Sequence, residues 1–435
     1  MGGTWTGENK IRPGVYVNFE QTSIQPDVSK RGIVTLPLDL AWGSEQQVIE
    51  ITGDMNTTSI FGDVIENILP LNEALKRAEK VLAYRLNPAS GANASGILGN
   101  LTATAKYTGE TGNDIQVVIE VNGAAFDVKT YFKNQMVDEQ EFAANTEDLQ
   151  DNDYVVFSGT GVLAANAGKT LTGGSSAGIT ASEYSAFRLA LEAYEWNVCA
   201  LYDVTDSAIK SAFKEWVERL RDQEGKKVIC VMNDYSTADY EGIISVKNGV
   251  VLSDAAVLAG EKAVAWVAGA AAAADTDESL TYDSYDGAVD VDIKYSNSEI
   301  ESAIEEGQMV FVSSNNKARV EYDINTLHTF TPEKGKMFRK NQVVRVLDTI
   351  NNDIIKICED YFIGKVNNND DGRNLLKNQI IKYLQRLLDK GSIKNFDTKT
   401  DVEVLMGVDS DSVVVNTAVQ PADSIEKIYI TVEVK

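Results

Sequence analysis

Apolar residues recur along the chain at the spacings of amphipathic helices and buried strands. In the last hundred residues, the three- and four-residue spacing from Val343 to Phe362 predicts one long amphipathic helix. After the polar stretch NNNDDG, a second helix is predicted over RNLLKNQIIKYLQRLLDKG and ends at Gly391. The strands TDVEVLMG and DSVVVNTAV follow, and the chain finishes with the predicted strand KIYITVEV. Its apolar residues, Ile428, Ile430, Val432 and Val434, alternate with Tyr429, Thr431 and Glu433.

The middle of the chain alternates between strand and helix patterns. A strand over Ile33–Leu36 and a helical pattern in LNEALKRAEKVLAYRL come first, and a helix capped by Ser182 starts the later part. The later elements are strand VCALYDV, helix SAIKSAFKEWVERLRDQ, strand KVICVMN, helix DAAVLAGEKAVAWVAGAAAAA and strand MVFVSS, with a hairpin turn at Asn315-Asn316. Such alternation is typical of a parallel α/β layer.

A segment with β character interrupts this alternation. NPASGANASGILGN reads as a linker, and the runs LTATAKYTG, DIQVVIEV, FDVKTYF and YVVFSG follow it. The Asn122-Gly123 dipeptide is a strong hairpin signal. Residues 97–160 are therefore predicted to form a small antiparallel β domain.

The first thirty residues are polar apart from one short extended run. Val15, Tyr16 and Val17 follow the turn signal Pro13-Gly14 and predict a strand. The next ten residues are polar and contain Pro26, so no local partner strand is available. We expect this strand to pair further away, including with another subunit.

Charge and composition narrow the function classes. The net charge of −25 disfavours binding to a phosphate backbone. From Thr331 to Lys435 there are 16 basic and 16 acidic residues, so the whole excess lies before Thr331. The longest apolar stretch, Ala263 to Ala274, is too short for a membrane span of about 20 residues, and no secretory signal precedes it. Three cysteines without CxxC spacing fit a soluble protein that folds in a reducing cytoplasm.

Familiar catalytic and metal-binding patterns are missing from the sequence. The single histidine, His328, has no acidic neighbour in sequence, which argues against a Ser-His-Asp triad and against a zinc site. AGKT at Ala167 to Thr170 lacks the first glycine of a phosphate-binding loop. The acidic stretches DVDIKY and NNNDDG do not space their carboxylates as a calcium loop does. We expect no catalytic residue, metal or cofactor.

Several motifs together resemble one known family. PGVYVNF, LTGG followed by ASEYSAFRLALEAYEWN, NVCALYDV, DGRNLLKNQIIKYLQRLLDKG and EKIYITVEV occur in the order found in contractile tail sheath proteins. The likeness is greatest to the short sheaths of Gram-positive phages, defective prophages and phage-tail-like bacteriocins. It implies an α/β and α+β multidomain fold. The expected parts are an N-terminal arm (1–30), an α/β part (31–94), an inserted antiparallel β-sandwich (95–170), a subtilisin-like parallel α/β domain without a triad (171–330) and an α+β C-terminal domain with a terminal strand arm (331–435).

The resemblance also implies a function and a set of partners. A sheath subunit polymerises as hexameric rings stacked around an inner tail tube, contracts, and meets baseplate and tail terminator proteins. It is not an enzyme, binds no nucleic acid and inserts into no membrane. Its location would be a virion tail or bacteriocin particle assembled in the cytoplasm of the bacterial host. Two alternatives stay open, a soluble α/β hydrolase-like enzyme with an inserted β domain and an acidic surface or capsid-type protein.

Two sets of residues are the candidate working parts. Strand pairing between subunits is predicted for Val15, Tyr16, Val17, Ile428, Tyr429, Ile430, Val432 and Val434, with pairing of the last strand inside its own domain as the alternative. A contact with the inner tube or a neighbouring subunit is predicted for the basic cluster Lys334, Lys336, Arg339, Lys340 and Arg345, with a solvated basic loop as the alternative.

Overall fold

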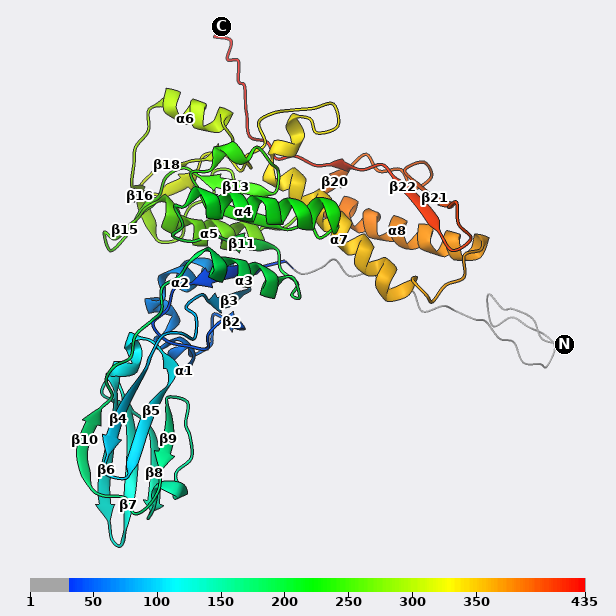
Figure 1. Ribbon diagram of the computed structural model, residues 1–435. Coiled ribbons are helices and arrows are strands. Elements are labelled where there is room, and N and C mark those ends of the chain that lie inside the picture. The colour runs from blue at the N-terminus through cyan, green and yellow to red at the C-terminus, as the bar shows by residue number, and fades with distance from the viewer. Residues whose placement is uncertain (1–30, 435) are drawn as a thin grey trace, which may run out of the picture. The chain divides into compact units, whose positions relative to one another are not determined.

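The computed structural model of the protein describes residues 31–434, and the largest sheet among them has seven strands (Figure 1). The strand order is β17-β13-β12-β11-β1-β3-β2, and neighbouring strands are parallel except for β2, which runs antiparallel to β3. The bounds are β1 Ile33–Leu38, β2 Val48–Thr52, β3 Lys80–Arg85, β11 Val198–Ala200, β12 Ile229–Asn233, β13 Ile243–Val246 and β17 Gln308–Met309.

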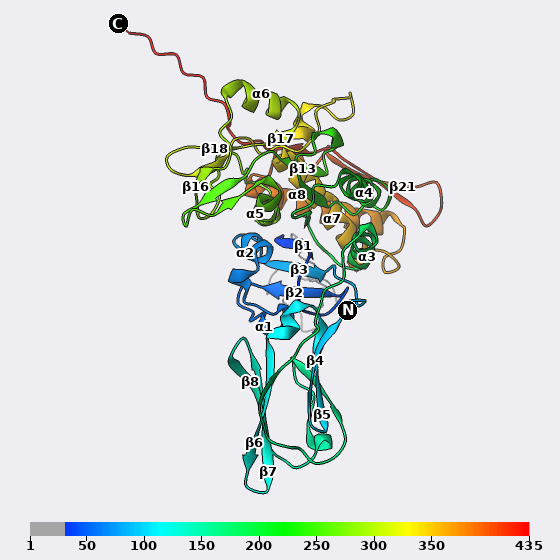
Figure 2. The ribbon, with the colours of Figure 1, turned by 60° about the vertical axis from the view of Figure 1, so that its left-hand side comes forward.

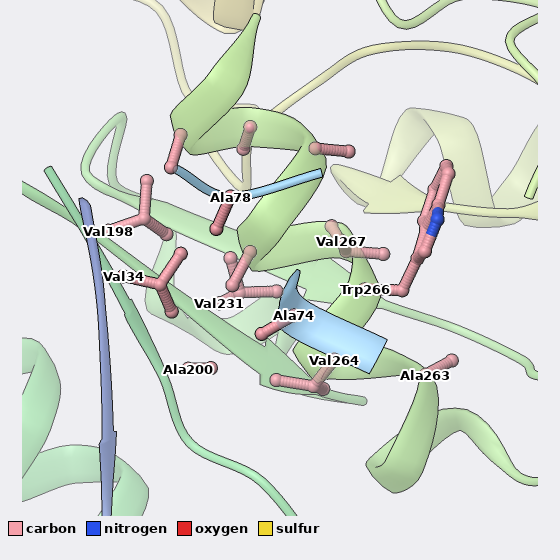
Figure 3. Close-up of a cluster of buried hydrophobic side chains, with 14 of the residues drawn as sticks. Val34, Ala74, Ala78, Val198, Ala200, Val231, Ala263, Val264, Trp266 and Val267 are labelled. Atoms are coloured by element: carbon pink, nitrogen blue, oxygen red, sulfur yellow. The ribbon is translucent and has the colours of Figure 1, made fainter. Parts of the chain in front are cut away.

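Helices cover both faces of this sheet. Alternate strand residues such as Val34, Val198 and Val231 pack with α2 (Leu69–Leu75) and α5 (Gly260–Ala273), as Figure 3 shows around Trp266 and Val264. The residues between them pack with α3 (Ala181–Leu191) and α4 (Ser207–Glu218) on the other face. Because successive strand side chains point to opposite faces, a strand covered on both sides is apolar throughout. The predicted parallel α/β layer is confirmed.

Two local predictions in this layer are wrong, and strand β13 (Ile243–Val246) was missed. The helical pattern LNEALKRAEKVLAYRL ends at Leu75, and its second half is the buried strand β3. The predicted helix from Asp254 begins only at Gly260, after the short strand β15 (Val257–Leu258). Strand β13, buried at all four positions, was not predicted. A short apolar run carries no period that separates a buried strand from a helix.

Smaller elements surround the sheet. Strands β14 (Val250–Leu252), β15 and β16 (Ala288–Val291) form a three-stranded sheet, and helices α1 (Thr58–Phe61) and α6 (Asn297–Glu305) lie in connecting segments. Strands β18 (Phe311–Ser313) and β19 (Ala318–Val320) form a hairpin. Its turn residues Asn315 and Asn316 have φ of 53° and 55°, which confirms the predicted turn.

Two further sheets face each other in the inserted segment (Figure 2). One has the order β10-β6-β7-β8 and the other β4-β5-β9. The bounds are β4 Asn93–Leu98, β5 Leu101–Thr108, β6 Ile115–Asn122, β7 Ala125–Phe132, β8 Gln135–Ala143, β9 Val155–Gly159 and β10 Asn166–Thr170. The hairpin at Asn122-Gly123 is confirmed, whereas the predicted linker forms strand β4 and the polar strands β8 and β10 were not predicted.

The aromatic centre of this sandwich comes partly from outside it. Trp42, in the loop after β1, is fully buried, stacks on Tyr154 and meets Tyr107 edge to face. Its indole N–H donates to the carbonyl of Ser59. Trp42 therefore belongs to the core of the sandwich, although its hydrogen bond to Ser59 is made outside the sandwich.

Two long helices dominate the last hundred residues, and both confirm their predictions. They are α7 (Asn341–Tyr361) and α8 (Asp370–Lys390), and Gly391 ends α8 with a φ of 84°. Residues 353–420 form a compact unit of their own, in which the hairpin β21 (Val402–Met406) and β22 (Val413–Thr417) packs on α8 through β21. Short strands β20 (Ile393–Lys394) and β23 (Gln420–Pro421) complete the chain's elements. The fold is thus a mixed α/β multidomain one with several sheets.

Candidate assembly surfaces

The predicted terminal strand KIYITVEV forms no strand with any part of residues 31–434. The side chains of Ile428, Ile430, Val432 and Val434 are 74%, 79%, 78% and 94% exposed. Both views show this red segment leaving the body without a neighbouring helix or strand from residues 31–352 (Figures 1 and 2). Pairing inside its own domain is therefore not what the described residues adopt, and the alternating apolar side chains remain uncovered.

The other predicted strand donors, Val15, Tyr16 and Val17, lie outside the described residues. Their role stays a prediction from sequence.

The predicted contact role of Arg339 and Arg345 does not fit their burial. Arg345 is 1% exposed, and its guanidinium donates to the carbonyl of Glu278 at 2.7 Å and lies 3.5 Å from the Asp323 carboxylate. Arg339 is also buried, and burial lowers the pKa of its guanidinium. Arg345 is thus held in the interior by these contacts, whereas Nε and Nη2 of Arg339 are buried without a hydrogen-bond partner among the described residues.

The three lysines of the cluster differ in how their charges are used. Lys340 lies within 2.7 Å of Asp423 and 2.6 Å of Glu426, both close to the start of the terminal segment. Burial alone would lower the pKa of Lys340, but its hydrogen bonds to these two carboxylates raise it well above the ordinary value. Lys334 pairs with Glu241 at 2.5 Å, and Lys336 is exposed. Of the five basic residues, Lys336 and, in part, Lys334 expose their charge at the surface of the described residues.

His328 has an acidic partner that the sequence did not reveal. Its Nδ1 lies 3.4 Å from Asp239 Oδ1 and 2.8 Å from the carbonyl of Thr326. Burial would raise the pKa of Asp239, but hydrogen bonds from residues 328 and 329 lower it overall. The pair ties the loop at residues 326–329 to Asp239.

Other kinds of site are missing from the part of the chain that the structure describes. Over residues 31–434 no three His, Cys, Asp or Glu side chains converge as metal ligands. Cys199 and Cys230 are buried side by side on β11 and β12, as expected for small apolar residues. None of the helices between residues 31 and 434 is long and apolar enough to cross a membrane.

The hairpin β21–β22 is a surface that sequence reasoning did not single out. Leu405 and Val414 are directly opposite each other on the two strands, and they are 44% and 47% exposed. Beside β22 lies a hollow of about 360 Å³. Its apolar lining includes Cys358, Ile363, Val366, Leu376, Val413 and Val415. A two-stranded sheet leaves a backbone edge on each side, so this hairpin can accept a further strand.

Four family descriptions match consecutive parts of the chain. Residues 31–86 match the tail sheath protein Gp18 domain III N-terminal region, and residues 86–176 match the phage tail sheath protein β-sandwich domain. Residues 177–326 match the phage tail sheath protein central domain, and residues 333–435 match the phage tail sheath C-terminal domain. A sheath tail protein from Desulfitobacterium hafniense is 46% identical, with a TM-score of 0.87 over 96% of this chain and 99% of its own. The chain belongs to the phage tail sheath protein family.

This sheath protein is also similar to a protein of a phage-like element and to the sheath of a contractile injection system. The phage-like element PBSX protein XkdK of Bacillus subtilis is 37% identical, covering 100% of this chain and 99% of its own. The PVC sheath complex of an extracellular contractile injection system, in its contracted state, shares the fold at 11% identity, with a TM-score of 0.60 over 98% of both chains. This sheath protein is thus a structural subunit of a phage tail or related apparatus, as predicted, and not the hydrolase of the alternative hypothesis.

Proposed function

We propose that the chain polymerises as hexameric rings stacked around an inner tail tube and contracts to drive that tube through the envelope of the target cell. Baseplate and tail terminator proteins are its further partners, and assembly takes place in the cytoplasm of the bacterial host. Family membership supports this proposal, as does the fold shared with a sheath in its contracted state. The observation that carries it is the unpaired terminal segment with its four uncovered apolar side chains.

The terminal segment has the properties of a donated strand. Ile428, Ile430 and Val432 are spaced by two residues, so in an extended chain they point to one side. Burying a side chain of this size contributes about 1.5–3 kcal/mol, and the backbone N–H and C=O groups can extend a sheet of another subunit. Such a contact joins different surfaces on the two partners. It therefore propagates into rings and helical stacks instead of closing a dimer.

The acceptor in this proposal is the hairpin β21–β22 of a neighbouring subunit. Neither edge of this hairpin pairs with another strand of residues 31–434, and the hollow beside β22 offers apolar contacts from Val413 and Val415. Alternate side chains of the donor would fill that hollow. Val15, Tyr16 and Val17 are the second donor, supported by their sequence pattern.

The proposal also assigns a role to each domain and describes how the domains move during contraction. The central domain is subtilisin-like without a triad, the sandwich faces outward, and the C-terminal domain lines the tube. The four consecutive family matches support boundaries close to those predicted. Contraction then moves these domains as rigid bodies, while the donated strands keep the subunits tied.

A tube or subunit contact is proposed for Lys336, with Lys334 beside it. Lys336→Glu should reduce the yield of extended particles formed with the tube protein, because the acidic subunit would then repel an acidic partner surface. The exposed Lys317→Glu is the matched control. Normal, contractile particles from Lys336→Glu would remove this contact from the proposal.

Truncation after Glu426 is the direct test of the donated strand. Electron microscopy of the full chain should show tubes or rings, whereas the truncated chain should remain monomeric with a melting temperature within a few degrees. Ile430→Asp, on the apolar side of the strand, should impair assembly more than Tyr429→Asp on the other side. Tubes of normal length and yield from the truncated chain would contradict the proposal.

A further inference from the structure

The start of the terminal segment is held against the body by three of its side chains. The Lys340 ammonium donates to both carboxylate oxygens of Asp423 at 2.8 and 2.7 Å and to Glu426 Oε2 at 2.6 Å. Between these two acids, the Ser424 hydroxyl donates to Gln342 Oε1 at 2.7 Å. Since Lys340 directly precedes α7 and Gln342 lies in its first turn, the contacts tie the segment to the start of this helix.

Glu426 is the most enclosed member of this group. Its side chain is 9% exposed, and its other carboxylate oxygen accepts a hydrogen bond from the Thr281 hydroxyl at 3.0 Å. The Lys340 ammonium also lies over the ring of Tyr322, 5.8 Å from its centroid. A charge pair partly withdrawn from water is screened less than an exposed pair, so it can hold a backbone segment in place.

The contacts end sharply after Glu426. Ile425 already points to solvent, and every described residue from Lys427 to Val434 is exposed. The segment therefore consists of a tethered root, residues 421–426, and a free part, residues 427–434. The boundary lies directly before the alternating residues of the proposed donor strand.

We infer that Lys340, acting through Asp423 and Glu426, is a positioning residue that fixes where and in which direction the terminal strand leaves the subunit. The inference rests on the proposed function, in which this strand pairs with a neighbouring copy. It gives Lys340 a role inside its own subunit, in place of the predicted contact with the tube. A fixed root restricts the volume that the free strand explores and so raises its effective concentration at the acceptor.

Releasing the root lengthens the freely moving end of the chain from roughly eight to roughly fourteen residues. The effective concentration of a tethered strand at its acceptor falls with about the −3/2 power of the tether length, so it should drop about twofold. Loss of the fixed direction adds to that change. We expect the protein concentration needed for tube formation to rise roughly two- to tenfold in Lys340→Met. The melting temperature should change by only a few degrees, because the released root can expose the carboxylates of Asp423 and Glu426 to water.

The experiment combines assembly with a direct measure of root mobility. A spin label at Ile425→Cys reports the motion of the root, and every variant is compared with a parent chain that carries the same label and Cys358→Ala, which keeps the hollow beside β22 apolar. Lys340→Met should narrow its spectrum and raise the concentration for tube formation. Lys340→Arg, which keeps a cation beside both acids, should behave nearly as the parent chain, and the exposed Lys317→Met is the matched control. Asp423→Asn with Glu426→Gln is the second variant should Lys340→Met fail to fold, and it should reproduce the effect.

The outcomes separate this inference from the proposed function. If truncation after Glu426 abolishes tubes while Lys340→Met assembles at the parent concentration with an unchanged spectrum, the positioning role is overturned and the donated strand stands. If the truncated chain still forms tubes, the proposed function itself fails. A loss of assembly in Lys340→Met that Lys340→Arg does not restore also overturns the positioning role.

Discussion

Arg221 and Asp348 form a two-point ion pair that the surrounding protein encloses almost completely. The Nη1–Oδ2 and Nη2–Oδ1 distances are 2.6 and 2.9 Å, and the two side chains are 3% and 7% exposed. Arg221 lies in the π-helical turn after α4, whereas Asp348 lies on α7. One pair therefore joins the α/β layer to the first turns of the long helix.

Removing one partner of this pair should destabilise the protein strongly. Asp348→Leu leaves the Arg221 charge buried without compensation, and the expected loss in free energy of unfolding is about 3–5 kcal/mol. The double variant Arg221→Met, Asp348→Leu should recover most of that loss, because no buried charge remains. Urea unfolding of the two variants measures the difference, and equal losses in both would contradict this account.

Gly269 on α5 marks a close approach to α2. A Cβ at this position would lie 2.3 Å from the carbonyl oxygen of Ala74, which is backbone and cannot move aside cheaply. Gly269→Ala should therefore cost about 1–3 kcal/mol of stability. Gly178→Ala, where a Cβ meets open space, is the control and should change stability little. Thermal unfolding of both variants tests this, and equal melting temperatures would count against the helix contact.

Trp42 should matter for the sandwich although it lies outside it. Trp42→Ala opens a cavity among Tyr107, Phe132 and Tyr154, and the expected cost is about 3–5 kcal/mol. Phe142→Ala removes an exposed aromatic side chain of the same sandwich and should cost far less. Calorimetry gives the two losses, and hydrogen exchange should place the weakening of Trp42→Ala in residues 93–170. Protection unchanged there would show that Trp42 does not support the sandwich.

Glu183 should make the stability of α3 depend on pH. Hydrogen bonds from the hydroxyls of Thr180 and Ser182, and then from the Thr180 backbone, lower its pKa from 4.5 to about 2. A carboxyl group whose pKa is lower in the folded state stabilises the protein above about pH 4.5 and loses that contribution as the pH falls to about 2.

Glu183→Gln should consequently lose about 0.5–1 kcal/mol at neutral pH, the usual value of a helix cap. Its stability should approach that of the parent chain as the pH falls toward 2. Glu301→Gln on α6 is the control, and denaturant unfolding between neutral and acidic pH makes the measurement. A stability difference independent of pH would assign the effect to something other than the carboxylate.

The local sequence pattern was sufficient to predict an element wherever that element depends on residues close to it in the chain. Helices α7 and α8 begin and end within about three residues of their predicted bounds, because an amphipathic period and a terminal glycine act within the helix itself. The hairpin turns at Asn122-Gly123 and Asn315-Asn316 were predictable for the same reason. Strands β3 and β13 were missed because both of their faces are covered, which removes the alternation that marks a strand.

The sequence by itself determined that this is an acidic α/β protein of the sheath family with an alternating apolar terminal segment. Only the tertiary structure decided what its charged and aromatic residues do. Arg345 and Lys340 belong to one basic run in the sequence, yet their partners differ. Arg345 lies beside the Asp323 carboxylate in the interior, whereas Lys340 pairs with Asp423 at the root of the terminal segment. The reason is that a charge is stabilised by whichever opposite charge folding brings within reach, and that partner can lie anywhere along the chain. The apolar face of Ile428 and its neighbours pairs with no strand of residues 31–434.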